Sequence, residues 1–231
     1  MNSGKIIFHS FLELIFPRLC VVCGNKLLHS EEYICLKCLL HLPRTNFRLQ
    51  QENQIAQLFY GRVPVERAYA YFEFKKGSNY QRILHLLKYR GWKEIGEFMG
   101  ERFASELLQA VDFPRPDFIC PVPLHPKKER KRGYNQSYHI ALGLAKQLHA
   151  PIIRDNIRRV IHTGTQTRKS RYERWKNVEG IFEVVDPDLF DGKHLVLVDD
   201  VVTTGATLEA CTGAILSCCN ARISILTLAI A

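Results

Sequence analysis

The chain has 231 residues, of which 46% are hydrophobic and 24% are charged. This composition is ordinary for a folded globular protein and argues against a wholly disordered chain. The length suffices for one good-sized domain with an independent core, or for such a domain with a small additional module. Lys and Arg number 32 against 23 Asp and Glu, a formal net charge of +9, which favours polyanionic or phosphorylated partners without identifying one.

An apolar stretch, GKIIFHSFLELIF, occupies residues 4–16. It contains His9 and Glu13 and is too short to span a bilayer. A secretory signal is also a poor description, because Pro17 follows it directly and a small-residue cleavage site is lacking. We therefore expect no membrane span, a cytoplasmic location and an amphipathic helix that packs on its own protein, with a membrane-surface helix as the alternative.

Two C-x2-C pairs separated by eleven residues follow in the sequence CVVCGNKLLHSEEYICLKC. Each pair can form a tight turn that presents two thiolates to one ion, and a short loop allows both pairs to converge on a tetrahedral Zn²⁺. The alternatives are four reduced structural cysteines or a redox C-x2-C, for which no surrounding βαβ pattern exists. We predict a zinc ribbon within residues 1–45, with these metal ligands: Cys20, Cys23, Cys35 and Cys38.

The remainder, residues 46–231, is expected to form an α/β domain that begins with a polar linker over residues 46–66. An aromatic-rich alternating strand follows, and then two helices broken near Gly91. Beyond Pro114, short apolar strands alternate with helices, which predicts a parallel sheet covered on both faces. Ligands of such sheets bind beyond the carboxyl ends of the strands, so the loops at these ends are of interest.

One such loop follows the sequence LVLVDD, where four apolar residues precede Asp199 and Asp200. Small and hydroxyl-bearing residues then lead into a helix, whose N-terminal N–H groups can hold a phosphate. Carboxylates beside a phosphate site are best explained as acceptors for hydroxyl groups or as indirect supports of a divalent cation. A ribose 5-phosphate carries hydroxyl groups that the carboxylates can accept from and a phosphate that the turn can hold. The residues of the phosphate turn are Thr203, Thr204, Gly205, Ala206 and Thr207.

Three alternatives compete for this stretch. A P-loop NTPase also has a strand ending in acids, but the chain contains no G-x4-G-K-[ST] sequence. A phosphoacceptor receiver domain has acids at a strand end, yet nothing in it requires T-T-G-A-T immediately afterwards. A plain strand-to-helix turn capped by Asp and Thr would explain only one or two of the residues.

Two further loops are rich in cations. The first, after a strand near Phe118, has a single acidic counter-charge and precedes Asn135, which can cap the next helix; its cations are Lys127, Lys128, Arg130, Lys131 and Arg132. The second, TQTRKSRYERWKN, interleaves cations with aromatic residues; its cations include Arg168, Lys169, Arg171 and Arg174. Both are consistent with a solvated surface or with nucleic-acid binding.

LVLVDDVVTTGAT resembles the signature for phosphoribosyl pyrophosphate in type I phosphoribosyltransferases. The resemblance implies that Asp199 and Asp200 bind the ribose hydroxyls and that residues 203–207 hold the 5-phosphate. It further implies that residues 127–132 serve pyrophosphate. Residues 165–177 would form a flexible loop that closes over the substrate and excludes water.

The order of the parts, from cysteine pairs through RGYNQS and TQTRKSRYERWKNVEGIF to DDVVTTGATL, resembles the ComF family over nearly the whole chain. That family combines a zinc ribbon with a type I phosphoribosyltransferase-like domain and is linked to DNA uptake in natural transformation. The resemblance implies phosphoribosyl pyrophosphate and Mg²⁺ as ligands, DNA-uptake proteins as partners, and a phosphoribosyltransferase whose acceptor the sequence does not identify. The alternative is a non-catalytic adaptor for single-stranded DNA that retains the sugar-phosphate pocket.

Overall fold

The computed structural model describes residues 17–45, 53–160 and 180–231. The predicted N-terminal amphipathic helix and the predicted flexible loop, with Arg168, Lys169, Arg171 and Arg174, lie outside these described residues. Within them, no helix combines the length and the apolar character that crossing a bilayer requires.

The core of the described chain is a four-stranded sheet in the order β1-β6-β5-β2, and each neighbouring pair in it is parallel. The strands are β1 (Arg67–Glu73), β2 (Phe118–Pro121), β3 (Ile157–Arg159), β4 (Phe182–Val184), β5 (His194–Val202) and β6 (Arg222–Ile230). The helices are α2 (Leu36–Leu40), α3 (Gln54–Gln57), α4 (Gln81–Tyr89), α5 (Lys93–Ala110), α6 (Pro126–Arg132), α7 (Gln136–Leu148) and α9 (Ala206–Leu216).

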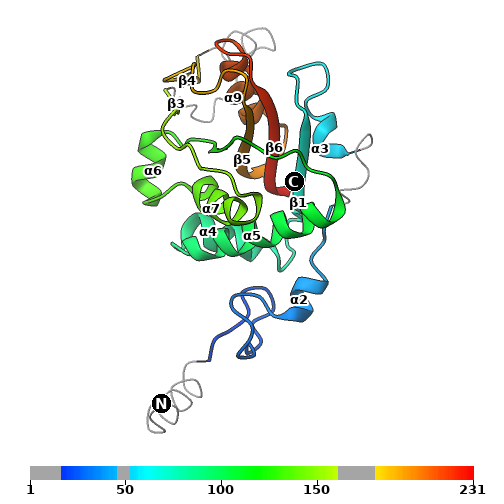
Figure 1. Cartoon of the computed structure of the whole chain (residues 1–231). Coiled ribbons are helices and arrows are strands. Elements are labelled where there is room, and N and C mark those ends of the chain that lie inside the picture. The colour runs from blue at the N-terminus through cyan, green and yellow to red at the C-terminus, as the bar shows by residue number, and fades with distance from the viewer. Residues whose placement is uncertain (1–16, 46–52, 161–179) are drawn as a thin grey trace, which may run out of the picture.

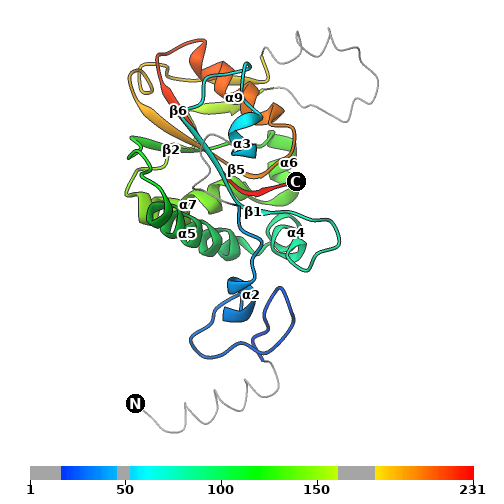
Figure 2. The same ribbon diagram turned by 90° about the vertical axis from the view of Figure 1, so that its right-hand side faces the viewer.

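Helices cover both faces of the sheet, and β5 shows how the sequence separates them. Val196 and Val198 belong to the core layer that contains α4, α5 and α7, whereas Leu195 and Leu197 belong to the layer that contains α3 and α9. Successive strand residues point to opposite faces, so an unbroken apolar strand fills both layers. Figures 1 and 2 show α9 and the pair α5–α7 on opposite sides of the sheet. The predicted α/β architecture is thereby confirmed.

Two of the predicted strands lie outside this sheet. β3 and β4 form a separate antiparallel pair, with Ile157 opposite Val184 and Arg159 opposite Phe182. Each strand has three residues, and its central residue is exposed. These segments are therefore too short and too polar to be buried on both faces as a parallel strand requires.

The basic segment expected as a loop is a short helix, α6. The Lys127 N–H donates to the ring of His125, at 3.2 Å, and Pro126 occupies the first turn. Gly133, at φ +84°, ends the helix in a left-handed conformation. Sequence patterning missed this helix because no residue in it is buried and it therefore lacks an apolar face.

Part of the expected linker is packed structure. Asn53 caps α3 by accepting from the Ile55 N–H at 2.9 Å, and its side-chain amide donates to the carbonyl of Ala68 at 2.6 Å. Ile55 and Phe59 are buried in the core layer that also contains α9. Residues 53–63 consequently belong to the body of the α/β domain.

The cysteine module lies at one end of this body, joined to it through α2 (Figures 1 and 2). Arg44, which follows the module, forms an ion pair with Glu106 of α5, and Tyr71 of β1 donates to the same carboxylate at 2.7 Å. Tyr80 donates to the carbonyl of Cys38 at 2.9 Å. Polar contacts thus fix the module against both the sheet and its helices.

Helices α5 and α7 approach each other through glycines. A Cβ atom at Gly143 would lie 2.0 Å from the carbonyl oxygen of Glu97, and one at Gly100 would lie 2.3 Å from that of Ile140. Both obstructing atoms are backbone, which cannot move aside as a flexible side chain can. The position of α7 against α5 therefore depends on the absence of a methyl group at these residues.

We expect Gly143→Ala to destabilise the protein by about 3 kcal/mol, since inserting atoms into a closely packed interface forces a backbone shift. Gly213→Ala in α9 is the matched control, because a Cβ atom there meets nothing within 4 Å. It should be neutral or stabilise by about 0.5–1 kcal/mol through helix propensity. Urea unfolding measures both changes, and equal effects of the two variants would contradict the packing argument.

Candidate functional site

The predicted phosphoribosyl motif lies at the carboxyl end of β5. The strand continues to Val202, so both acids belong to its last part and do not follow its end as the sequence suggested. Asp199 pairs with Thr227 of β6 and lies one residue beyond Val198, the last residue of β5 that pairs with β2. Parallel strands deliver their loops to one edge, so β2 brings the segment that contains α6 to the same edge.

Asp199 is held in place by two donors. The Ser137 hydroxyl donates to its Oδ1 at 3.0 Å, and the Asp200 N–H donates to the same oxygen at 2.8 Å. Removal from water raises the pKa of Asp199 to about 7, and the neighbouring charge of Asp200 adds to this rise. Ser137 is in place because Asn135 caps α7, accepting from the Ser137 N–H at 3.0 Å, as the sequence predicted.

Asp200 pairs with a residue that the sequence did not single out. The Lys88 ammonium, from the last turn of α4, lies 3.0 Å from Asp200 Oδ1. The two side chains are only 23% and 13% exposed. Lys88 lies 112 positions before Asp200 in the chain, and the helical pattern around it gave no signal for a role at this site.

The turn after β5 leads into the N-terminus of α9. Gly205, at φ +78°, precedes the first helical residue, Ala206, and such a conformation favours glycine. Thr203 and Thr204 are exposed. The first N–H groups of an α-helix have no partner within the helix, so this turn can present backbone donors and hydroxyls to an anion.

The turn is supported from behind by the segment that follows α3. A Cβ atom at Gly205 would lie 3.2 Å from the Phe59 ring, so the ring packs directly on the turn. Arg62 donates to the carbonyl of Thr204 at 3.2 Å and pairs with Glu209 of α9 at 3.3 Å. Sequence reasoning missed these supports because it treated residues 46–66 as a linker.

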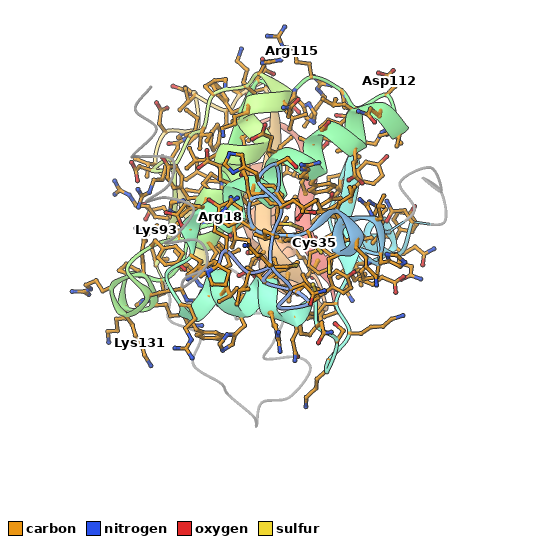
Figure 3. All side chains as sticks on the ribbon, turned by 90° about the horizontal axis from the view of Figure 1, so that it is seen from below. Arg18, Cys35, Lys93, Asp112, Arg115 and Lys131 are labelled. Carbon is orange, nitrogen blue, oxygen red and sulfur yellow. The ribbon has the colours of Figure 1, made fainter. Side chains whose placement is uncertain are left out.

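The predicted pyrophosphate residues lie along α6. Four of them are exposed, namely Lys127, Lys128, Arg130 and Lys131. Figure 3 shows Lys131 at the outer side of α6, directed away from the body. Arg132 is half-buried; it donates to the side chain of Gln136 and lies over the ring of Tyr89, 5.7 Å from its centre. α6 thus presents four exposed cationic side chains and a fifth, Arg132, that is held in place by its neighbours.

A cavity of about 460 Å³ lies beside α6 and continues toward β3. Its lining includes His125, Arg154, Arg158 and Arg159, and Arg154 pairs with Glu129 of α6 at 2.8 Å. Burial lowers the pKa of Arg159, while the charge of Asp199 acts in the opposite direction. The lining of this cavity is thus rich in cationic side chains, and one of them, Arg159, interacts electrostatically with Asp199.

The four predicted zinc ligands come together at the start of the described chain. One thiol sulfur from each of Cys20, Cys23, Cys35 and Cys38 lies within 4.8 Å of the others. The Sγ atoms of Cys23 and Cys35 are 3.8 Å apart, and a tetrahedral site with Zn–S bonds of ~2.3 Å requires sulfur separations of about 3.8 Å. Gly24, at φ +77°, provides the turn after the first pair.

The surrounding backbone also favours the thiolate form of one of the four cysteines, Cys20. Burial by itself raises the pKa of Cys20, but backbone N–H groups of Cys23, Cys35 and Val22 outweigh it and bring the pKa to about 7. The Cys35 N–H donates to Cys20 Sγ at 3.3 Å. Thiolates are the form in which cysteine binds metal, so the cluster suits a thiophilic ion such as zinc.

Known proteins with similar sequences are named for DNA utilization or for competence. No family model matches the chain. It is 36% identical to DNA utilization protein YhgH of Salmonella typhi over 129 residues, which is 54% of this chain and 56% of that protein. It is 38% identical to competence protein F of Haemophilus influenzae over 41% of this chain and 42% of that protein. The match therefore spans only about half the length of these relatives.

A longer match is with competence protein ComFC of Bacillus subtilis, at 28% identity over 87% of this chain and 72% of that protein. Solved structures with similar folds include the allosteric regulatory enzyme of purine biosynthesis, at 18% identity and a TM-score of 0.42, over 58% of this chain and 25% of that chain. A hypoxanthine phosphoribosyltransferase from Staphylococcus aureus is 17% identical, at a TM-score of 0.37, over 68% of this chain and 73% of that chain. The chain is thus a homologue of the competence proteins ComFC and F, which confirms its ComF resemblance.

Proposed function

We propose that the site at the carboxyl end of β5 binds phosphoribosyl pyrophosphate with Mg²⁺. One observation carries the proposal: adjacent carboxylates in the last part of β5 are followed, after Val202, by a glycine turn that opens α9. Asp199 and Asp200 accept from the ribose hydroxyls, and the turn, residues 203–207, holds the 5-phosphate. A carboxylate next to a phosphate site is otherwise unfavourable, so a ligand with a hydroxyl end and a phosphate end explains both.

The cations of α6 are assigned to the pyrophosphate end of the ligand. They stand on the segment that follows β2, the neighbour of β5. Mg²⁺, when bound with the ligand, supplies charge neutralisation for pyrophosphate. The carboxylates at the end of β5 suit a role as indirect supports of such a hard cation, which keeps several of its waters. The role of residues 165–177 as a closing loop remains a prediction.

The reaction class that suits this ligand is phosphoribosyl transfer. In it, pyrophosphate leaves ribose C1 while a nucleophile attacks from the opposite face. The chain would contribute positioning and electrostatic stabilisation through its acids and basic residues, and no general base is required of it. Because the relatives are named for competence and DNA utilization, we propose that this pocket serves DNA uptake, together with proteins of that machinery. The cytoplasmic location remains a prediction.

A second candidate function is binding of single-stranded DNA. It is favoured by exposed aromatic side chains among cations where α4 meets α5: Tyr89 is 67% exposed and Trp92 is 42% exposed. Arg132 of α6 lies over the Tyr89 ring, so this aromatic site adjoins the basic helix. Stacking of bases on aromatic rings beside phosphate-binding cations is the usual mode of sequence-independent single-strand binding.

The cysteine cluster is proposed to hold one structural Zn²⁺. All four ligand positions are taken by thiols, which leaves no open position for a substrate or water. Tyr80 and α2 connect this cluster to the body of the domain. Zinc would therefore stabilise the cysteine module and its contacts with the α/β domain.

For the pocket, calorimetric titration with phosphoribosyl pyrophosphate and Mg²⁺ should show binding to the native chain. Replacing both acids, Asp199→Asn with Asp200→Asn, should weaken it by at least about 10-fold, since charged hydrogen-bond acceptors are lost. Asp188→Asn, an exposed carboxylate elsewhere, is the matched control and should bind normally. Equal affinities of native and double-variant chains, or no binding by either, would contradict the assignment of this site to phosphoribosyl pyrophosphate.

For the second candidate, binding of a single-stranded oligonucleotide should depend steeply on salt. Replacing Lys127, Lys128 and Lys131 by Gln should reduce the slope of log K against log salt concentration by about 2, because each neutralised phosphate contributes ~0.7. Trp92→Ala should weaken binding by about 10-fold through lost stacking. Absence of binding even at low salt excludes this function.

For zinc, metal analysis of the reduced, folded protein should find about one Zn²⁺ per chain. Cys35→Ser should lose the metal and lower the thermal stability, because a ligand is removed. Cys218→Ser, which replaces an exposed thiol outside the cluster, should keep both. Native protein that is folded, reduced and free of zinc contradicts the proposal.

A further inference from the structure

Lys88 is held in an unusual position for a lysine side chain. Lysine ordinarily keeps its ammonium in water, yet here it is only 23% exposed and lies 3.0 Å from Asp200. Ordering this long side chain costs rotamer entropy, and taking both charges out of water costs solvation free energy. A partly buried pair of this kind is weak evidence for stability, which directs attention to a role in the pocket.

The direction from which Lys88 reaches the acids is informative. α4 packs in the core layer that contains α5 and α7, whereas α9 packs in the layer on the other face of the sheet. Lys88 therefore approaches Asp200 from the face opposite to α9. The phosphate turn, which α9 continues, is supported from its own face by Phe59.

The residues on both sides of Lys88 contact the α6 segment. The Tyr134 hydroxyl, just after α6, donates to the carbonyl of Leu87. Arg132 lies over the ring of Tyr89, 5.7 Å from its centre. The last turn of α4 is thus fixed between the acids of β5 and the cations assigned to pyrophosphate, and Lys88 stands at that junction.

We propose that Lys88 is a ligand-binding residue that contacts the pyrophosphate end of the bound sugar phosphate. This inference rests on the proposed function of the pocket. An ammonium group has three donors, so it can keep its bond to Asp200 while another N–H donates to a pyrophosphate oxygen. Asp200, in turn, accepts from a ribose hydroxyl with its remaining lone pairs.

This geometry makes Lys88 a determinant of ligand specificity. Phosphoribosyl pyrophosphate has an anionic group at both ends, whereas ribose 5-phosphate has only the end assigned to the phosphate turn. Loss of the Lys88 ammonium should therefore weaken the first ligand and spare the second. A residue that only stabilised the fold or oriented Asp200 would affect both ligands alike.

The test is calorimetric titration of both ligands, with Mg²⁺, into the native chain and three variants. Lys88→Met should weaken phosphoribosyl pyrophosphate by about 10- to 100-fold, the usual effect of removing a charged hydrogen bond. Its affinity for ribose 5-phosphate should stay within about 2-fold of native. Lys88→Arg keeps the charge but changes the donor geometry and should give an intermediate affinity for phosphoribosyl pyrophosphate.

Lys193→Met is the matched control for the loss of one positive charge. Lys193 is exposed and precedes the first residue of β5, at the end of the strand opposite to the acids. It should bind both ligands as the native chain does. Thermal unfolding checks that each variant is folded before its affinities are compared.

Two outcomes would overturn the inference while leaving the proposed function intact. The first is native affinity of Lys88→Met for phosphoribosyl pyrophosphate; the second is an equal loss for both ligands, which would make Lys88 a residue that acts through Asp200. Absence of phosphoribosyl pyrophosphate binding by the native chain is a different result. It overturns the proposed function, and this inference with it.

Discussion

Two adjacent carboxylates in the last part of a central strand, Asp199 and Asp200, impose an electrostatic constraint on which the surrounding structure depends. Burial raises the pKa of Asp199 from its ordinary 3.8 to about 7, with Asp200 contributing. Because the folded-state pKa is raised, the contribution of Asp199 to stability is complete below about pH 4 and is lost as the pH rises through about 7. At higher pH the ionised pair opposes folding, and Ser137 and Lys88 offset part of that cost.

The surrounding structure can be understood as the means of holding these acids beside an anion-binding turn. β5 lies between β2 and β6; β2 pairs with it as far as Val198, and β6 continues to pair with it up to Val202. α7 brings Ser137 to Asp199, and the glycine contacts between α5 and α7 set the position of that helix. On the other face, Phe59 and Arg62 support the phosphate turn. Elements distant in sequence thus converge on one short segment of β5.

The sequence was most informative where local pattern determines structure. The apolar run before Asp199, the turn at Gly205 and the paired cysteines each predict their own geometry, and the structure places them accordingly. It was least informative where contacts join distant segments. Nothing near Lys88 indicates Asp200, and nothing in the polar residues 46–66 indicates that Phe59 packs on the turn. α6 was missed because charged residues cover it on all sides.

The central claim is that one sugar phosphate is held at its two ends by a single strand-turn-helix segment. A crystal structure of the chain with phosphoribosyl pyrophosphate and Mg²⁺ tests this most directly. The account predicts ribose hydroxyls within hydrogen-bond distance of Asp199 and Asp200, and the 5-phosphate against the backbone N–H groups of residues 203–207. A ligand bound elsewhere, or bound here with its phosphate directed away from the turn, would contradict it.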